Sequence, residues 1–126
     1  MNYEVKGQIY GFGNTFNVKI SEIDELFWTM QDADNENISF TLANPYLLRE
    51  YSFDVPTNLR VLLDIKEDSK IRVYNVVVIQ NPLEKSSINF LAPIIVNEDN
   101  MTVGQALLKK DRHPDLGITE TIESFR

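Results

Sequence analysis

The sequence contains no cysteine and only one histidine in 126 residues. Without cysteine the chain has no disulfide, no thiolate zinc site and no cysteine nucleophile. Small secreted domains often depend on disulfides, so their absence favours a reducing compartment. The single histidine, His113, stands beside Pro114 in a polar stretch, where we interpret it as a solvated side chain rather than a general base.

Long apolar runs are also missing from the sequence. The longest are Val76–Ile79 and Leu91–Val96, far short of the roughly 20 residues that a membrane-spanning helix needs. The first residues lack the basic region and apolar stretch of a signal peptide. These absences predict a cytoplasmic protein that has no contact with a membrane.

Apolar residues are nevertheless frequent enough to form a packed core. They make up 43% of a chain whose 126 residues match the usual size of one domain. We find no internal repeat, linker or low-complexity tract, so we predict a single domain over 1–126. Its last part, 109–126, is polar and weakly patterned and is interpreted as a C-terminal tail.

The net charge of −7 is concentrated in one segment. No lysine or arginine occurs between Lys19 and Arg49, whereas six acidic residues do: Glu22, Asp24, Glu25, Asp32, Asp34 and Glu36. Because proteins bind nucleic acids chiefly by neutralising phosphates with basic side chains, we expect no direct binding of RNA or DNA. An acidic face suits a basic protein partner, although a solvated hairpin kept soluble by its charge explains the same residues equally well.

Alternation of apolar and polar residues indicates that most of the chain is extended. Apolar segments at 26–30 and 38–43 flank the polar stretch 31–37, which predicts a β-hairpin with a long acidic tip. Val76–Ile79 is apolar at every position, as is typical of a strand covered on both faces. Gly104 interrupts a further extended run and indicates a bulge or a close approach of another segment.

One segment departs from this alternation. Leu59, Leu62 and Leu63 recur at helical spacing shortly after Pro56, which predicts one short helix from about 56 to 65. The sequence therefore predicts a mainly β, single-domain fold, a curled antiparallel sheet or β-barrel, with one short helix.

The residue patterns of common catalytic and cofactor sites are not completed. The stretch 32–37 has the acidic spacing of a calcium loop but carries asparagine where the turn glycine is needed. Gly11 and Gly13 lack the third glycine of a dinucleotide-binding loop. Paired carboxylates such as Glu22 and Asp24 suit a glycosidase only when buried, and nothing in the sequence indicates burial. We expect no enzyme activity, no cofactor and no metal.

Residues 88–97, Ile-Asn-Phe-Leu-Ala-Pro-Ile-Ile-Val-Asn, resemble the N-[LF]-x-A-P-[IV]-x-[IV]-N signature of the flagellar assembly factor FliW family. Three weaker blocks are similar as well: Gly11-Phe12 to the family's early G-F turn, 40–46 to its F-x-[LV]-x-[DN]-P block, and 104–108 to its closing G-Q-x-x-L strand. One departure is His113, where related chains often carry tyrosine.

The resemblance implies a non-enzymatic regulator of flagellar assembly with two protein partners. Such a protein binds flagellin in the cytoplasm. When free, it binds the translational repressor CsrA away from the RNA surface, antagonises it allosterically and so relieves repression of flagellin mRNA. By linkage, it binds RNA-free CsrA more tightly than RNA-bound CsrA.

From the charge and the resemblance together, we expect partner contacts at these residues: Glu22, Asp24, Asp32, Asp34, Glu36, Asn44, Tyr46 and Asn89. Asn89 equally suits a structural role, satisfying backbone groups at a bent strand. Two other classes of protein stay open. One is a β-barrel that binds a small ligand or carbohydrate in a cavity lined by Trp28 and tyrosines, and the other is a hydrolase with a buried acid pair.

Overall fold

The computed structural model describes residues 1–125, and residue 126 of the predicted tail lies outside them. The described part forms one nine-stranded sheet with the strand order β4-β3-β2-β1-β8-β7-β5-β6-β9. The strands are β1 (Asn2–Val5), β2 (Asn17–Glu22), β3 (Phe27–Asp32), β4 (Asn35–Ala43), β5 (Ile71–Val78), β6 (Ser87–Ile88), β7 (Ile94–Asn97), β8 (Thr102–Gln105) and β9 (Glu120–Thr121). The helical segments are α1 (Thr57–Leu62) and the 3-10 turns η1 (Pro45–Leu47), η2 (Leu83–Lys85) and η3 (Ile122–Phe125).

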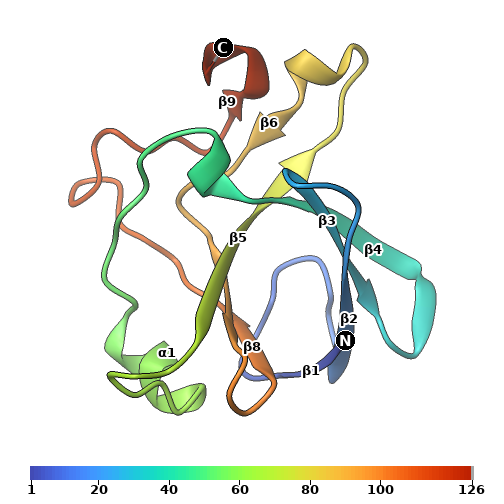
Figure 1. Cartoon of the computed structure of the whole chain (residues 1–126), viewed down its shortest axis with the longest axis vertical. Coiled ribbons are helices and arrows are strands. Elements are labelled where there is room, and N and C mark those ends of the chain that lie inside the picture. The colour runs from blue at the N-terminus through green and yellow to red at the C-terminus, as the bar shows by residue number, and fades with distance from the viewer. Residues whose placement is uncertain (126) are drawn as a thin grey trace.

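A pairing between β4 and β5 closes part of this sheet into a barrel made of β1–β5, β7 and β8. Figure 1 shows β5 crossing the barrel diagonally, with α1 below its start. All pairings are antiparallel except that of β1 with β8, where Glu4 lies opposite Thr102. The predicted mainly β, barrel-like fold is confirmed. The parallel seam requires a long connection between its two strands, which alternation alone does not reveal.

The barrel interior follows directly from the alternation. Val18 and Ile20 of β2 point inward and are buried, while the lysine between them is exposed. The same side of the neighbouring strands supplies the rest of this core, which contains Tyr3, Ile9, Phe12, Met30, Leu42, Tyr74, Ile94, Val96 and Val103.

A second core lies between the barrel and the segments that cross its outer side. Tyr51 is central to it: its hydroxyl donates to the carbonyl of Phe90, and the amide of Asn75 donates to the same hydroxyl at 3.2 Å. Apolar residues from the C-terminal segment, Leu116 and Ile122, are buried in this core. The stretch predicted as a polar tail is therefore anchored to the barrel by Leu116 and Ile122, although many of its other described residues are exposed.

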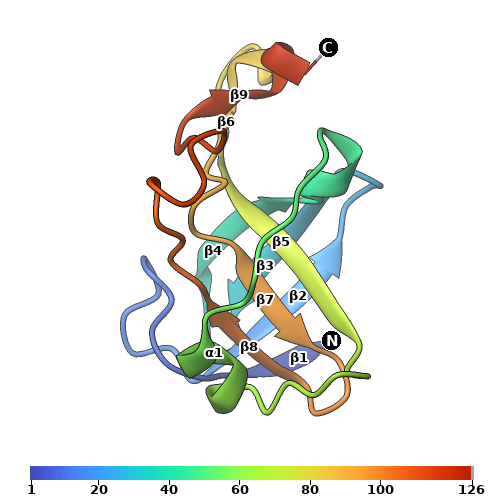
Figure 2. The same cartoon turned by 90° about the vertical axis from the view of Figure 1, so that its left-hand side faces the viewer.

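The single predicted helix is present, but α1 covers only Thr57–Leu62 instead of 56–65. It ends where Asp64 adopts a left-handed φ of 52°. Leu59 and Leu63 are buried, whereas Leu62 is half exposed because it lines an open cleft between α1 and the barrel. Figure 2 shows α1 beside β8. There an ideal Cβ on Gly104 would lie 2.6 Å from Leu59 Cδ1, so the close approach expected at this glycine is confirmed.

Two local expectations are wrong. The acidic hairpin tip is short, because β3 continues to Asp32 and β4 begins at Asn35, with Ala33 and Asp34 alone between them. The end of β5 is not covered on both faces: Val78 is 56% exposed and Ile79 is 50% exposed. Here β5 has reached the end of the barrel, so its outward side chains meet solvent. None of the helices within residues 1–125 is long and apolar enough to cross a membrane.

Candidate partner-binding surface

The acidic residues do not form one surface. In the β2–β3 pairing Glu22 lies opposite Trp28, and Val18 lies opposite Asp32. Glu22 and Asp24 are therefore at one end of this hairpin, and the tip residues Asp34 and Glu36 are at the other. A strand rises about 3.3 Å per residue, so the two groups are separated by roughly 17 Å along β3.

Asp32 is not available to a partner. It is only 8% exposed. Thr15 Oγ1 donates to its Oδ2 at 2.8 Å, and the backbone N–H of Asp34 donates to its Oδ1 at 2.9 Å. Its role is to hold the hairpin turn against the loop between β1 and β2.

The two asparagines in the expected set also satisfy backbone groups. Asn44 Oδ1 accepts from the N–H of Tyr46 at 3.1 Å and caps η1. Asn89 Oδ1 accepts from the N–H of Leu91 at 2.9 Å, in the bend between β6 and β7. Tyr46 differs from the two asparagines, because 54% of the surface of this residue is exposed at the edge of the barrel. Partial burial still raises the pKa of its hydroxyl.

The largest open hollow beside these residues is an apolar groove of about 720 Å³. It lies at the end of the molecule that is uppermost in Figure 1, between the β2–β3 turn, η1, η2 and η3. We call it the rim groove, and its lining is Asp24, Glu25, Leu26, Phe27, Leu47, Leu48, Leu83 and Phe125. Leu47 and Leu83 expose 55% and 45% of their surface, although both are apolar. Exposed apolar residues gathered in this way typically mark an interaction site.

The acidic side of the rim groove is held in a fixed shape by Asp24. Its Oδ1 accepts from the N–H of Leu26 at 2.9 Å and of Phe27 at 2.7 Å. The turn that follows β2 is thereby fixed, and it carries the exposed carboxylate of Glu25. Of the predicted acids, Asp24 alone lines the groove.

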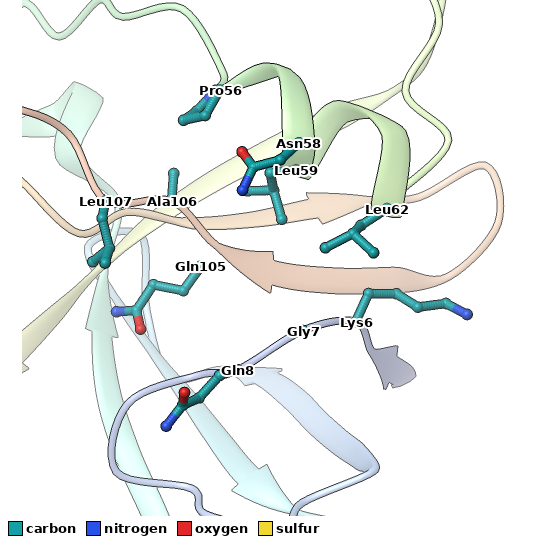
Figure 3. Close-up of a pocket in the computed structure, with 10 residues that line it drawn as sticks. All are labelled: Lys6, Gly7, Gln8, Pro56, Asn58, Leu59, Leu62, Gln105, Ala106 and Leu107. Carbon is teal, nitrogen blue, oxygen red and sulfur yellow. The ribbon is translucent and has the colours of Figure 1, made fainter.

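Figure 3 shows a second cleft, with a volume of about 290 Å³. It lies between α1 and β8, with Leu59 and Leu62 on one side and Gln8 and Gln105 on the other. Gln105 is already engaged, donating to the carbonyl of Ala92 at 3.1 Å and accepting from the N–H of Tyr10 at 2.9 Å. A carbohydrate-binding barrel would require a cavity lined by Trp28 and tyrosines. These residues do not line this cleft, but Trp28, Tyr46 and Tyr74 line a separate pocket of about 240 Å³.

Groups suited to acid–base chemistry are scattered over the chain. Within residues 1–125, no three His, Cys, Asp or Glu side chains come together in a group able to hold a metal. His113 is half-buried beside Arg112 and Lys109, in a separate cleft next to α1. The predicted acid pair, Glu22 and Asp24, is exposed, so it lacks the burial that a hydrolase acid needs.

A closed barrel with an acid-rimmed apolar groove at one end defines a small β-barrel protein. The model of the FliW protein family matches residues 2–116, and the chain belongs to this family.

Individual relatives agree with the family match. Flagellar assembly factor FliW 2 of Wolinella succinogenes is 46% identical over 125 residues, covering 99% of this chain and 92% of the relative. Flagellar assembly factor FliW 1 of the same organism is 45% identical, covering 99% and 98%. The crystal structure of a flagellar assembly factor FliW superposes with a TM-score of 0.86 over 96% of this chain and 84% of that one. That structure is 18% identical and so bears on the fold alone.

The apolar residues of the rim groove could not be predicted from the sequence. Leu47, Leu83 and Phe125 come from three separate short turns, η1, η2 and η3. The only signal available was local. Leu47 and Leu83 each follow a proline within two residues, and an apolar residue exposed in such a turn is unusual.

Proposed function

We propose that this flagellar assembly factor acts by binding other polypeptides. It binds flagellin in the cytoplasm. When it is free of flagellin, it binds the translational repressor CsrA and antagonises it allosterically, which relieves repression of flagellin mRNA. The proposal is supported by relatives that are 45% and 46% identical over nearly the whole chain and are named flagellar assembly factors.

The observation that carries the proposal is the rim groove. Several of its apolar side chains pack against the second core, whereas Leu47 and Leu83 are about half exposed. Covering the exposed half of such a side chain contributes on the order of 1 kcal/mol. A few of these contacts, surrounded by residues that exclude water, are enough to dominate the free energy of binding.

The acidic rim favours a basic partner. Asp24 and Glu25 border the groove, and the chain as a whole carries a net charge of −7. A repressor that binds RNA presents lysine and arginine side chains, and charges of opposite sign speed association and orient the two proteins. Antagonism then requires that this chain bind RNA-free CsrA more tightly than RNA-bound CsrA, and the coupling is reciprocal.

The test is to place a charge in the groove. Leu47→Asp and Leu83→Asp are each titrated against CsrA and against flagellin by calorimetry. Each variant is expected to weaken binding of at least one partner by about tenfold or more, because a buried unpaired carboxylate is costly. Val61→Asp is the matched control: Val61 is 75% exposed on α1, outside the groove. If the unmodified protein and the three variants bind with equal affinity, the groove has no part in binding. If the unmodified protein binds neither CsrA nor flagellin, the proposed function is wrong.

The allosteric part has its own measurement. The protein is added to a preformed complex of CsrA with flagellin mRNA, and the dissociation rate of the RNA is followed. Allosteric antagonism predicts a faster RNA dissociation rate that increases with the concentration of added protein. Simple competition predicts an unchanged dissociation rate. Flagellin added first should abolish the effect.

A further inference from the structure

One edge of strand β5 is unpaired although it lies in the wall of the barrel. On one side β5 pairs with β7 over Ile71–Tyr74. On the other side it pairs with β4 only from Asn75 to Val77. The stretch 71–74 therefore has a neighbouring strand on one side alone.

The backbone groups that face the open side can be identified from the alternation. The N–H of Glu98 donates to the carbonyl of Lys70, and the N–H of Asn89 donates to the carbonyl of Val76. Even-numbered residues of β5 thus face β7 and β6, and odd-numbered residues face the other way. The N–H and C=O groups of Ile71 and Val73 point to the open side, and no hydrogen bond to them from that side is found within residues 1–125.

Pro45 is the reason that β4 stops. The β4–β5 register places Ala43 opposite Asn75, so the next hydrogen-bonded pair would join Pro45 to Val73. Proline has no N–H to donate. Its carbonyl already accepts from the N–H groups of Leu48 at 3.0 Å and Arg49 at 3.1 Å, at the start of η1. The chain turns away, and the edge of β5 is left open.

The open edge borders a pocket of about 240 Å³ lined by aromatic and polar side chains. Trp28 and Tyr74 pack on each other with ring centroids 5.2 Å apart, and the Arg72 guanidinium lies 5.7 Å from the Trp28 ring. The indole Nε1 of Trp28 is buried without an acceptor. Tyr46 completes the pocket at the end nearest to β4.

The charged residue that lines this pocket is Arg72, and its pairing with Glu98 neutralises its charge. Glu22 lies directly across the β2–β3 pair from Trp28, and no cation is paired with it within residues 1–125. An incoming group with a lysine or arginine is therefore favoured over an acidic one.

We propose that the edge of β5 from Ile71 to Val73 binds an extended polypeptide segment that carries an apolar and a basic side chain two residues apart. The segment adds to the barrel as a short strand. Two N–H and two C=O groups, spaced two residues apart along one edge, are matched by the backbone of another extended chain. Trp28 and Glu22 are opposite each other in the β2–β3 pair, so their side chains share one face. Residues two apart in the added strand also share a face, so the aromatic pocket takes the apolar side chain and Glu22 takes the basic one. This site stands on the strand geometry and goes beyond the proposed partners and the rim groove.

The test uses amide hydrogen exchange measured by NMR, with the peptide acetyl-TKTVTKT-amide as the probe, whose valine and lysines share one face of the strand. In the free protein, the Ile71 and Val73 amides are expected to exchange at least about tenfold faster than those of Arg72 and Tyr74, which bond to β7. Saturating peptide is expected to slow the Ile71 and Val73 amides by about tenfold or more. A fully N-methylated copy of the peptide keeps the side chains but has no backbone donors, and is expected to leave exchange unchanged.

Three results would overturn the proposal. The first is strong protection of Ile71 and Val73 in the free protein, since their groups would then be paired already. The second is unchanged exchange of these amides at millimolar peptide. The third is equal protection by the N-methylated copy, which would indicate attraction of charge without strand pairing. Calorimetry with CsrA and flagellin reports separately on the proposed function, so the two can fail independently.

Discussion

The Oγ1 of Thr15 donates a hydrogen bond of 2.8 Å to the Oδ2 of Asp32, and both side chains are buried. Thr15 belongs to the loop between β1 and β2, and Asp32 ends β3. The second carboxylate oxygen accepts from the N–H of Asp34 in the turn. An aspartate in an acidic segment is thus part of the structure of the barrel end.

Asp32→Ala is expected to destabilise the fold by about 1–3 kcal/mol, because it leaves the turn N–H of Asp34 without its acceptor and opens a gap beside the buried Thr15, whose hydroxyl keeps the Phe12 carbonyl at 2.7 Å. The measurement is urea unfolding followed by circular dichroism. Asp34→Ala removes an equal charge from an exposed side chain two residues away, and its effect should stay within about 0.5 kcal/mol. Equal losses in the two variants would show that the charge, rather than the bond to Thr15, matters.

The strands could be predicted from the sequence because burial alternates along them. Val18 and Ile20 illustrate this: each is buried, and the residue between them is exposed. The role of Asp32 could not be predicted, since it depends on a contact with Thr15 across 17 positions. The loss of burial at the end of a strand could not be predicted either. Val78 is exposed, although its apolar run suggested cover on both faces.

The candidate surface was only half predictable. Asp24 was found from charge, and it does line the rim groove. Leu47, Leu83 and Phe125 were not found, because the groove is assembled from segments that the folded chain alone brings together. Periodicity and turn-forming residues can be read from the local sequence, but the local sequence does not show which turns become neighbours in the fold.

Gly104 has no room for a side chain. An ideal Cβ there would lie 2.6 Å from Leu59 Cδ1 and 3.2 Å from the backbone oxygen of Lys6. Gly104→Ala is therefore expected to push α1 away from β8, at a cost of about 1–3 kcal/mol. Urea unfolding gives the change in free energy.

A double-mutant cycle with Leu59 tests the cause of that loss. Leu59→Ala alone should cost about 2–5 kcal/mol, because it opens a cavity under the helix. In the Leu59→Ala background the methyl group added at position 104 no longer clashes with the leucine side chain. The double variant should therefore lose less free energy of unfolding than the sum of the losses in the two single variants. Strict additivity would exclude the contact between Gly104 and Leu59 as the reason.

Tyr51 is expected to make stability depend on pH in the alkaline range. Burial is the main cause that raises the pKa of its hydroxyl from 10.0 to about 12. Between these values the unfolded chain loses the proton first, so the stability that is present below pH 10 declines as the pH rises towards 12. Two pKa units correspond to at most about 2–3 kcal/mol.

Urea unfolding at several pH values between 9 and 12 measures this decline, and Tyr51→Phe is the matched variant. It removes the titrating hydroxyl and the bond to the Phe90 carbonyl. The variant should be less stable at pH 9 by about 1–2 kcal/mol and flatter in its pH dependence. Burial also raises the pKa values of Tyr3 and Tyr74, so some slope should persist. An unchanged slope would mean that Tyr51 does not titrate in this range.

Arg49 is expected to hold the C-terminal segment on the barrel. Its guanidinium pairs with Glu120 at 3.1 Å and with Asp115 at 3.2 Å, and it stacks on the rings of Phe90 and Phe125. Arg49→Ala should raise the rate of amide exchange over 115–125 by about tenfold or more, with little change inside the barrel.

Two further variants separate charge from geometry at this position. Arg49→Lys keeps the charge but loses the planar fork and much of the stacking, so it should recover only part of the protection. Arg60→Ala removes an exposed arginine from α1 and should leave 115–125 unchanged. Full recovery with lysine would show that charge alone fixes the segment.

The two separated acidic groups give a matched test of which end of the barrel meets a basic partner. Glu25→Lys reverses charge beside the rim groove, and Glu36→Lys reverses it at the hairpin tip. Both variants change the net charge by the same amount, so long-range attraction falls equally in the two. Contact at the groove end predicts that the first variant binds CsrA at least about tenfold more weakly than the second at 0.15 M salt, where charges beyond about 8 Å are screened. If the tip variant loses as much affinity as the groove variant, attraction is non-local and the rim groove has no special part in docking a basic partner.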